Sequence, residues 1–250
     1  MPSVPRSPYP PAAVGWLVGD RPARVLDLGS GKGGFAQMLV DAGHEIFCVD
    51  RSPKAAAELN GRVGMFRPVA ARVEALPFFS CHFDVVTASQ SLHHFAPGLA
   101  LTEIARVLKP GGRIAIAYNT RDDTVPWVKR LMAMTRGADP EAMTGDYGLH
   151  AVDTVSDSPY FAALERRTFR NWIPVTRPAL LAMVERRPGT ARLDSTTRQA
   201  LLHDVGELYD TVARPPEPLL LPYQAACWRA EVDHSQLAIA EDPDAVEIKF

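Results

Sequence analysis

Several features that would assign the chain to a familiar class are missing. Its three cysteines, Cys48, Cys81 and Cys227, lie far apart and form no Cys-x-x-Cys pair. This spacing argues against a zinc site or a disulfide framework, and it favours a reducing compartment, with the cytoplasm as the expected location. No apolar run reaches the roughly 18 residues of a membrane span, and residues 1–11 lack the apolar core of a signal peptide. We therefore expect no membrane partner.

An excess of charge is missing as well. The net charge is -2, and no cluster of Lys and Arg is interleaved with aromatic residues. Such a balance gives no long-range attraction for phosphate backbones, so nucleic acid is not an expected partner. The 250 residues, 46% of them hydrophobic, suffice for a single α/β domain with an inserted cap. The sequence does not decide the oligomeric state, and a homodimer is compatible with it.

A glycine-rich turn between a strand and a helix is the most informative feature that is present. Residues Arg24–Asp27 predict a short buried strand, and Phe35–Gly43 has helical spacing that ends on a glycine. A second apolar strand, Glu45–Val49, then ends on Asp50, so the three elements form a βαβ unit. Glycines let the backbone approach a ligand closely, and the helix N-terminus offers free N–H groups. The turn therefore suits a ribose attached to an anionic or zwitterionic group.

Two cofactors fit this turn. The pattern Gly29-x-Gly31-x-x-Gly34 matches the dinucleotide fingerprint, whereas Asp27-x-Gly29-x-Gly31-x-Gly33 matches the first motif of class I S-adenosylmethionine-dependent methyltransferases. Asp27 separates the two interpretations. A carboxylate has no obvious use beside a pyrophosphate, but it suits the ammonium and sulfonium groups of S-adenosylmethionine.

Strands and helices continue to alternate after Asp50. The expected elements are a helix over Pro53–Asn60, strands over Met65–Val69 and Phe83–Ala88, a helix over Ala100–Leu108, a turn at Lys109–Gly112 and a strand over Arg113–Tyr118. They continue with a helix over Thr124–Arg136, a polar loop over Gly137–Pro159, a strand over Phe161–Trp172, helices over Arg177–Arg187 and Ser195–Tyr209, and a final strand over Leu219–Trp228. This order predicts a doubly wound, Rossmann-like α/β fold whose seven-stranded sheet has strands 1–6 parallel and the last strand antiparallel.

Three regions are expected along the chain. Residues 1–20 form an extended arm and a first helix, residues 21–230 form the catalytic domain, and residues 231–250 form a tail. Within the domain, residues 121–160 exceed the length of a plain connection, so we expect a helical lid there over the acceptor pocket.

Four motifs in order and spacing resemble the class I methyltransferases. They are Val25–Gly33, Glu74–Phe78, Phe83–Val86 and Glu103–Gly112. The chain is similar to the small-molecule branch that includes ubiquinone-biosynthesis and trans-aconitate methyltransferases, in an actinobacterial form. The resemblance is specific over residues 24–118 and looser to about residue 230. It implies methyl transfer from S-adenosylmethionine to an oxygen or carbon of a small-molecule acceptor, which leaves S-adenosylhomocysteine.

The resemblance also implies the cofactor site. Asp27 and the turn from Gly29 to Gly33 would hold the methionine moiety, and Asp50 would accept hydrogen bonds from the ribose hydroxyls. Arg72 stands where the family often has an aspartate for adenine; it cannot accept that bond, so Glu74, backbone carbonyls or stacking would replace it. The complete expected set is Asp27, Gly29, Ser30, Gly31, Gly33, Asp50, Arg51, Val73, Glu74, Ser89 and Gln90.

His93 and His94 follow the fourth strand, where the family admits the acceptor. Adjacent residues cannot point the same way on a helix, and no third ligand lies at metal spacing, so no metal site is expected. One of them could take a proton from a hydroxyl or an acidic carbon, and His94 is preferred because the aromatic Phe95 follows it. A carboxylate acceptor would need no base. The candidates that would then hold it are Tyr118, Arg121 and Trp127.

Other polar residues are expected to serve the fold. Asp84 lies at the start of a strand, far from the ligand edge, so it should pair within the protein. The remaining histidines, His44, His82, His150, His203 and His234, are interpreted as surface or capping residues.

Three further functions stay open. A nicotinamide oxidoreductase would share the turn and Asp50, but it would leave Asp27 unexplained. A nucleic-acid or protein amino-group methyltransferase should carry an Asn- or Asp-Pro-Pro-Tyr tetrapeptide where this chain has Ala88–Ser91. The strongest competitor is a non-catalytic S-adenosylmethionine-binding protein of the same fold, which Lys32 and Arg72 suggest.

Overall fold

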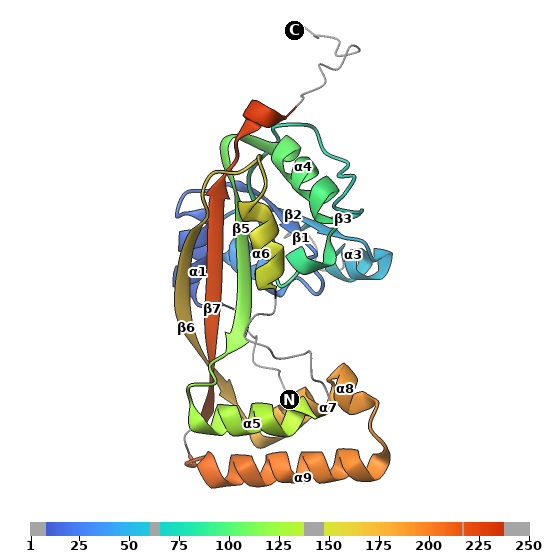
Figure 1. The fold of residues 1–250 in the computed structure, drawn as a ribbon, viewed down its shortest axis with the longest axis vertical. Helices are drawn as coiled ribbons and strands as arrows, with labels where there is room; N and C mark the ends of the chain where they lie inside the picture. The colour runs from blue at the N-terminus through green and yellow to red at the C-terminus, as the bar shows by residue number, and fades with distance from the viewer. Residues whose placement is uncertain (1–8, 61–65, 138–147, 217, 238–250) are drawn as a thin grey trace, which may run out of the picture.

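The computed structural model describes residues 9–60, 66–137, 148–216 and 218–237. An upper part contains most of the sheet and its covering helices, and a layer of helices lies below it (Figure 1). Residues 1–8, Met65, Tyr147 and most of the expected tail fall outside the described ranges. The division into arm, domain, lid and tail stays a prediction.

Seven strands form one mixed sheet in the order β3-β2-β1-β4-β5-β7-β6. The strands are β1 (Arg24–Leu28), β2 (Glu45–Asp50), β3 (Arg67–Ala70), β4 (Phe83–Ser89), β5 (Leu108–Arg121), β6 (Glu165–Val175) and β7 (Leu219–Glu231). Neighbours from β3 to β5 are parallel, and β7 is antiparallel to both β5 and β6. Six strands therefore run in one direction and only the last opposes them, which confirms the predicted fold.

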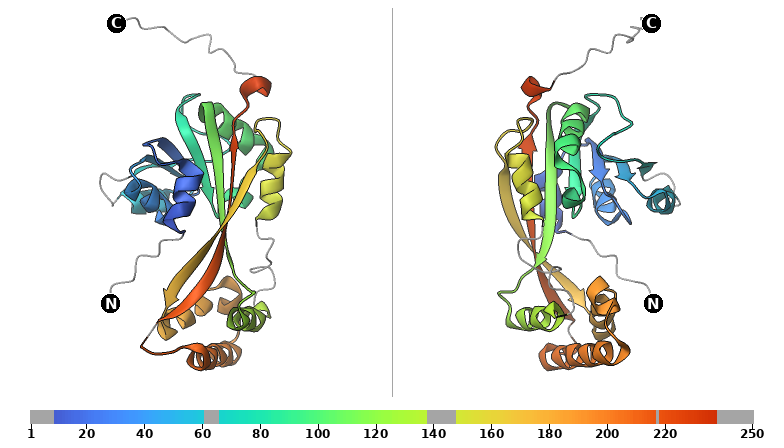
Figure 2. Two further views of the ribbon diagram at one scale, coloured as in Figure 1. Left: turned by 90° about the vertical axis from the view of Figure 1, so that its left-hand side faces the viewer. Right: turned by 45° about the vertical axis from the view of Figure 1, so that its right-hand side comes forward.

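Helices cover both faces of the sheet. Figure 2 shows α1 (Pro11–Val18), α2 (Gly34–Asp41) and α3 (Pro53–Asn60) on one face, and α4 (Pro97–Val107) and α6 (Leu149–Ser156) on the other. Each face has its own buried apolar cluster, so the sheet is covered as a parallel sheet requires. No helix within the described ranges is long and apolar enough to cross a bilayer.

The lower part of the molecule is a helical layer on an extension of the sheet. Strands β5, β6 and β7 continue beyond their neighbours and carry α5 (Pro126–Arg136), α7 (Arg177–Glu185), α8 (Pro188–Ala191) and α9 (Ser195–Val212) (Figure 1). A third apolar cluster, which includes Leu131, Leu180 and Val205, joins α5, α7 and α9. The two helices in the expected lid, residues 121–160, therefore have different neighbours: α5 belongs to the helical layer, and α6 packs near α4.

Two local expectations were wrong. The turn at Lys109–Gly112 lies inside β5, where the register jumps between the pairs Phe83–Leu108 and Val85–Arg113. The polar loop at Gly137–Pro159 contains α6, because Val152 and Val155 are spaced to bury one helical face.

Candidate active site

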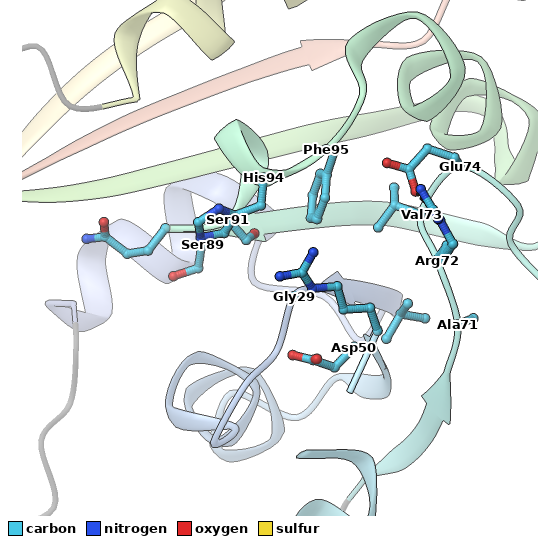
Figure 3. A pocket seen from close by; sticks show the side chains of 13 residues that line it. Gly29, Asp50, Ala71, Arg72, Val73, Glu74, Ser89, Ser91, His94 and Phe95 are labelled. Carbon is cyan, nitrogen blue, oxygen red and sulfur yellow. Dashed lines mark hydrogen bonds and ion pairs between the residues drawn. The ribbon is translucent and has the colours of Figure 1, made fainter. Parts of the chain in front are cut away.

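A cavity of about 620 Å³ opens at the carboxyl ends of β1, β2 and β4. This volume is typical of small-molecule sites. It is lined by Gly29, Val49, Asp50, Arg51, Ala71, Arg72, Val73, Glu74, Ser89, Gln90, Ser91, His94 and Phe95. In Figure 3, Asp50 and Phe95 lie on opposite walls, with Ser89 toward one end and Glu74 toward the other. Four residues of the expected set, Asp27, Ser30, Gly31 and Gly33, do not line the cavity.

The turn after β1 is held against its neighbours. Gly29 has a φ of +68°, and a Cβ there would lie 2.6 Å from the Cβ of Ser91. The N–H groups of Gly29 and Ser30 both donate to the carbonyl of Val49, at 2.7 and 3.2 Å. Gly33 serves packing instead, because a Cβ there would collide with Leu59. Only the first glycine of the motif thus brings backbone to the cavity wall.

Asp50 ends β2 and fixes the next part of the turn. Its Oδ2 accepts from the N–H of Gly31 at 3.1 Å, and its Oδ1 accepts from the N–H of Ser52 at 2.8 Å. Carboxylate oxygens accept more than one hydrogen bond each, so both retain capacity toward the cavity. Gly31 therefore orients Asp50 without lining the cavity.

Asp27 lies beneath the turn and is only 1% exposed. Its Oδ1 accepts a 2.8 Å hydrogen bond from the hydroxyl of Thr87. Burial raises the pKa of Asp27 to about 6, although the hydrogen bond from Thr87 favours the charged form. None of the ion pairs found among the described residues includes this carboxylate. A buried carboxylate of this kind attracts a positive ligand to the turn above it.

Glu74 supplies an acceptor at the opposite end of the cavity. Its Oε1 accepts from the N–H of Ala96 at 3.0 Å, and its Oε2 lies 3.5 Å from Nε of Arg72. The hydrogen bond from Ala96 holds the pKa of Glu74 below its ordinary value. The Arg72 side chain is 77% exposed, so it reaches Glu74 from the solvent side.

A pair of charged residues on α4 holds the loop that follows Glu74. Arg106 donates to the carbonyls of Phe78 and Leu76, at 2.8 and 3.0 Å. Glu103 accepts from the N–H of Leu76 at 2.8 Å and pairs with Arg106 at 2.7 Å. In the sequence, Glu103 and Arg106 were identified only as part of the family motif Glu103–Gly112. Their spacing of three residues, which places both on one helix face, was the available signal.

Tyr9, which the sequence did not predict as part of the site, contacts Ser89 at one end of the cavity. The Ser89 hydroxyl donates to the Tyr9 oxygen at 3.0 Å, and the Tyr9 hydroxyl donates to the carbonyl of Ala117 at 3.1 Å. The ring is 1% exposed, and burial raises the phenol pKa well above its ordinary value. The proline-rich segment around Tyr9 carries no sequence signal of this contact.

Gln90 adopts a left-handed backbone conformation, with a φ of +58°, immediately after Ser89. Its N–H donates to the carbonyl of Ala117 at 2.9 Å, and its side chain donates to the carbonyl of Asn119 at 3.3 Å. Non-glycine residues rarely adopt this conformation, and those that do cluster at functional sites. The strand end is therefore fixed by contacts with β5.

The two adjacent histidines face different cavities. His94 is exposed and lines the main cavity, whereas His93 lines a second cavity of about 250 Å³. Their ring centroids are nevertheless only 3.9 Å apart, because they lie on a short 3-10 turn, Leu92–His94. The Tyr118 hydroxyl contacts Nδ1 of His93 at 3.1 Å. Burial, with a contribution from His94, lowers the pKa of His93.

The remaining sequence expectations have mixed outcomes. Asp84 pairs within the fold as predicted, with Lys109 at 2.7 Å and with the N–H of Arg24 at 2.8 Å. The interpretation of His44 as a surface or capping residue was wrong, because His44 is 6% exposed and its ring nitrogens have no hydrogen-bond partner within the described ranges. Burial lowers the pKa of His44. Tyr118 is 1% exposed behind His93. No three metal-binding side chains cluster within the described part of the chain.

Comparison with known proteins agrees with this geometry. Residues 26–116 match the family model described as a methyltransferase domain. An uncharacterized methyltransferase of Mycobacterium tuberculosis is 31% identical over 228 residues, which cover 90% of each chain.

Solved structures share the fold. A methyltransferase structure from Anaeromyxobacter dehalogenans has a TM-score of 0.66 at 20% identity, and the match covers 89% of this chain and 96% of that one. A Haemonchus contortus N-methyltransferase, solved with phosphomonomethylethanolamine and S-adenosylhomocysteine, has a TM-score of 0.52 at 17% identity and covers 88% of this chain and 51% of its own. The glycine turn, the sheet order and the full-length relative together show that the chain belongs to the class I methyltransferase family.

Proposed function

We propose that this protein transfers a methyl group from S-adenosylmethionine to an oxygen or carbon of a small-molecule acceptor. The observation that carries the proposal is the buried carboxylate of Asp27, which has no cationic partner among the described residues and lies under the turn that faces the cavity. A sulfonium and an ammonium group supply the missing positive charge. A pyrophosphate would add negative charge at the same place.

The cavity supports one orientation of the cofactor. Asp50 lies on the central wall and accepts hydrogen bonds from the ribose hydroxyls, while Val73 and Glu74 hold the adenine end. Ser89 and Gln90 then receive the methionine moiety. Arg51 covers the ribose from the same turn as Asp50. In this orientation Glu74 provides the hydrogen-bond acceptor for adenine that Arg72 cannot provide.

Methyl transfer requires little chemistry from the protein. The acceptor oxygen or carbon attacks the methyl carbon, the carbon–sulfur bond breaks, and its electron pair stays on sulfur, which becomes the neutral thioether of S-adenosylhomocysteine. The chain holds the two reactants in line and excludes water. Where the acceptor carries a proton, His94 takes it, because His94 faces the main cavity.

The base can be tested by comparing His94→Ala with His93→Ala. For a hydroxyl or carbon acid, the loss of the base should slow turnover by about 10²- to 10⁴-fold. We expect the larger loss in His94→Ala, with unchanged affinity for S-adenosylhomocysteine in both variants. A larger loss in His93→Ala would assign the role to His93 instead.

The function itself is tested with methyl-labelled S-adenosylmethionine and a panel of small hydroxy, carboxylic and carbon-acid compounds. Formation of S-adenosylhomocysteine together with a labelled product supports the proposal. Tight cofactor binding without turnover on the panel would favour the non-catalytic alternative. Binding of NAD in place of S-adenosylmethionine would favour an oxidoreductase.

A further inference from the structure

Arg121, the last residue of β5, carries a half-buried cationic group that the described residues leave incompletely bonded. One guanidinium nitrogen, Nη1, is shielded from solvent and has no hydrogen-bond partner among the residues that the structure describes. The other terminal nitrogen, Nη2, lies 3.5 Å from the sulfur of Met183 on α7. A thioether is a weak acceptor, so this contact replaces little of the hydration that the guanidinium has lost.

A second donor converges on the same sulfur. Tyr223 pairs directly with Arg121 in the β5–β7 ladder, and its hydroxyl lies 3.9 Å from the sulfur of Met183. Two strong donors thus share one weak acceptor, and no ion pair between Arg121 and a described carboxylate is found. An arrangement of this kind suits an acceptor supplied from outside the chain.

The strand links this cluster to the main cavity. Ser89 of the cavity pairs with Ala117, and Gln90 of the cavity donates to the carbonyl of Asn119. Side chains alternate along a strand, so Ala117, Asn119 and Arg121 share one face. The backbone between Ala117 and Arg121 spans about 13 Å. Arg121 therefore lies beyond the cofactor end of the cavity, toward the helical layer.

We propose that Arg121 and Tyr223 form an anchor for a carboxylate of the methyl acceptor. The proposal rests on the proposed function, because it requires a methyl acceptor in this region. Because Arg121 lies about 13 Å along the strand from Ala117, the partner of Ser89, the anchored carboxylate would orient the acceptor while another atom reacts. A single guanidinium balances one negative charge, which suits a carboxylate better than a phosphate dianion.

The test uses paired probes that differ only in charge. Thermal unfolding of the protein saturated with S-adenosylhomocysteine is measured with hexanoate against hexanamide and with benzoate against benzamide. The variants are Arg121→Met, which removes the cation at similar length, and Tyr223→Phe, which removes one donor. Arg192→Met is the matched control, since Arg192 is exposed and outside the site.

The acids should stabilise the wild-type complex more than their amides, with about 10- to 100-fold tighter apparent binding. This preference should vanish in Arg121→Met, weaken in Tyr223→Phe and persist in Arg192→Met. Arg121→Met should unfold no earlier than wild type without probes, because it removes a half-buried cation whose Nη1 has no hydrogen-bond partner among the described residues.

Three results would overturn the anchor. The first is equal stabilisation by acids and amides in the wild type. The second is loss of the S-adenosylhomocysteine shift in Arg121→Met, which would assign Arg121 to the cofactor. The third is an acid preference that survives in both Arg121→Met and Tyr223→Phe. Failure of the proposed function would be distinct: either the wild type would show no shift with S-adenosylhomocysteine, or it would show that shift but no turnover in the assay with methyl-labelled S-adenosylmethionine.

Discussion

The hydroxyl of Thr87 on β4 donates a 2.8 Å hydrogen bond to the carboxylate of Asp27 on β1. The two residues pair directly in the parallel ladder, and both are buried. This bond satisfies one oxygen of a carboxylate whose pKa burial still raises to about 6. The charged form is therefore costly to the folded protein, and in the proposed function a positive ligand above it would supply the missing stabilisation.

This relationship predicts how stability changes with pH. The ordinary pKa of 3.8 rises to about 6 on folding, so the stability contributed by protonated Asp27 is present below about pH 4 and is lost as the pH rises through 6. Asp27→Asn removes that loss. In urea unfolding, the free energy of unfolding of Asp27→Asn should exceed that of the wild type. The difference should widen from pH 4 to pH 7 and reach about 1–3 kcal/mol.

Asp84→Asn provides a control of opposite sign. Although burial raises the pKa of Asp84, hydrogen bonds from Lys109 and from the Arg24 main chain hold it below its ordinary value. The stability it contributes is present at neutral pH and is lost as the pH falls. A margin for Asp27→Asn that does not change with pH would contradict the assignment of a buried, uncompensated charge.

Alanine substitutions at Gly33 and Gly43 distinguish the cost of a packing collision from the cost of backbone strain. Both have positive φ, +72° and +89°, but a Cβ at Gly43 would meet nothing within 4 Å, whereas one at Gly33 would collide with Leu59. Gly43→Ala should cost about 1 kcal/mol of the free energy of unfolding. Gly33→Ala should cost about 1–3 kcal/mol more, because overpacking adds to the strain. If both variants lost the same free energy of unfolding, the collision between the new Cβ and Leu59 would be relieved by local movement.

Asp50 is predicted to carry much of the ribose binding. Asp50→Ala removes two acceptor oxygens and should weaken cofactor binding by about 1.5–3 kcal/mol. Asp50→Asn keeps one of the oxygens and should lose less. Calorimetric titration with S-adenosylhomocysteine measures both variants, and unfolding without ligand checks that the turn at Gly31 survives. Wild-type affinity in Asp50→Ala would remove Asp50 from the site.

The α4 pair predicts an effect on binding from residues outside the cavity. Arg106→Met breaks the hydrogen bonds to the carbonyls of Leu76 and Phe78. The wall around Glu74 should loosen, and affinity for S-adenosylhomocysteine should fall. Affinity for methylthioadenosine, which keeps adenine, should fall by a similar factor. Undiminished binding of both compounds would show that Glu103 and Arg106 contribute to stability and not to ligand binding.

Local patterns predicted the upper part of the fold well. The helix Pro53–Asn60 has the bounds that its proline start indicated, and the turn after β1 joins the elements that its glycines predicted. These features depend on residues close together in the chain. Seven residues of the cofactor set that the family resemblance implied also line the cavity: Gly29, Asp50, Arg51, Val73, Glu74, Ser89 and Gln90.

What the sequence did not predict depends on contacts between distant segments. The extension of β5 to Arg121 requires pairing with Tyr223, and the helical layer joins α5 to helices from residues 177–212. The contact between Tyr9 and Ser89 spans 80 residues. His44 lies between the end of α2 and the start of β2, and no local pattern predicts that it is buried.

The most direct test of the account is calorimetric titration of the wild-type protein with S-adenosylmethionine, S-adenosylhomocysteine and NAD at pH 5.5 and 7.5. We expect binding of the first two compounds, no binding of NAD, and tighter binding of S-adenosylmethionine at pH 7.5, because Asp27 is charged above about pH 6. Binding of NAD alone, or of none of the three, would contradict it.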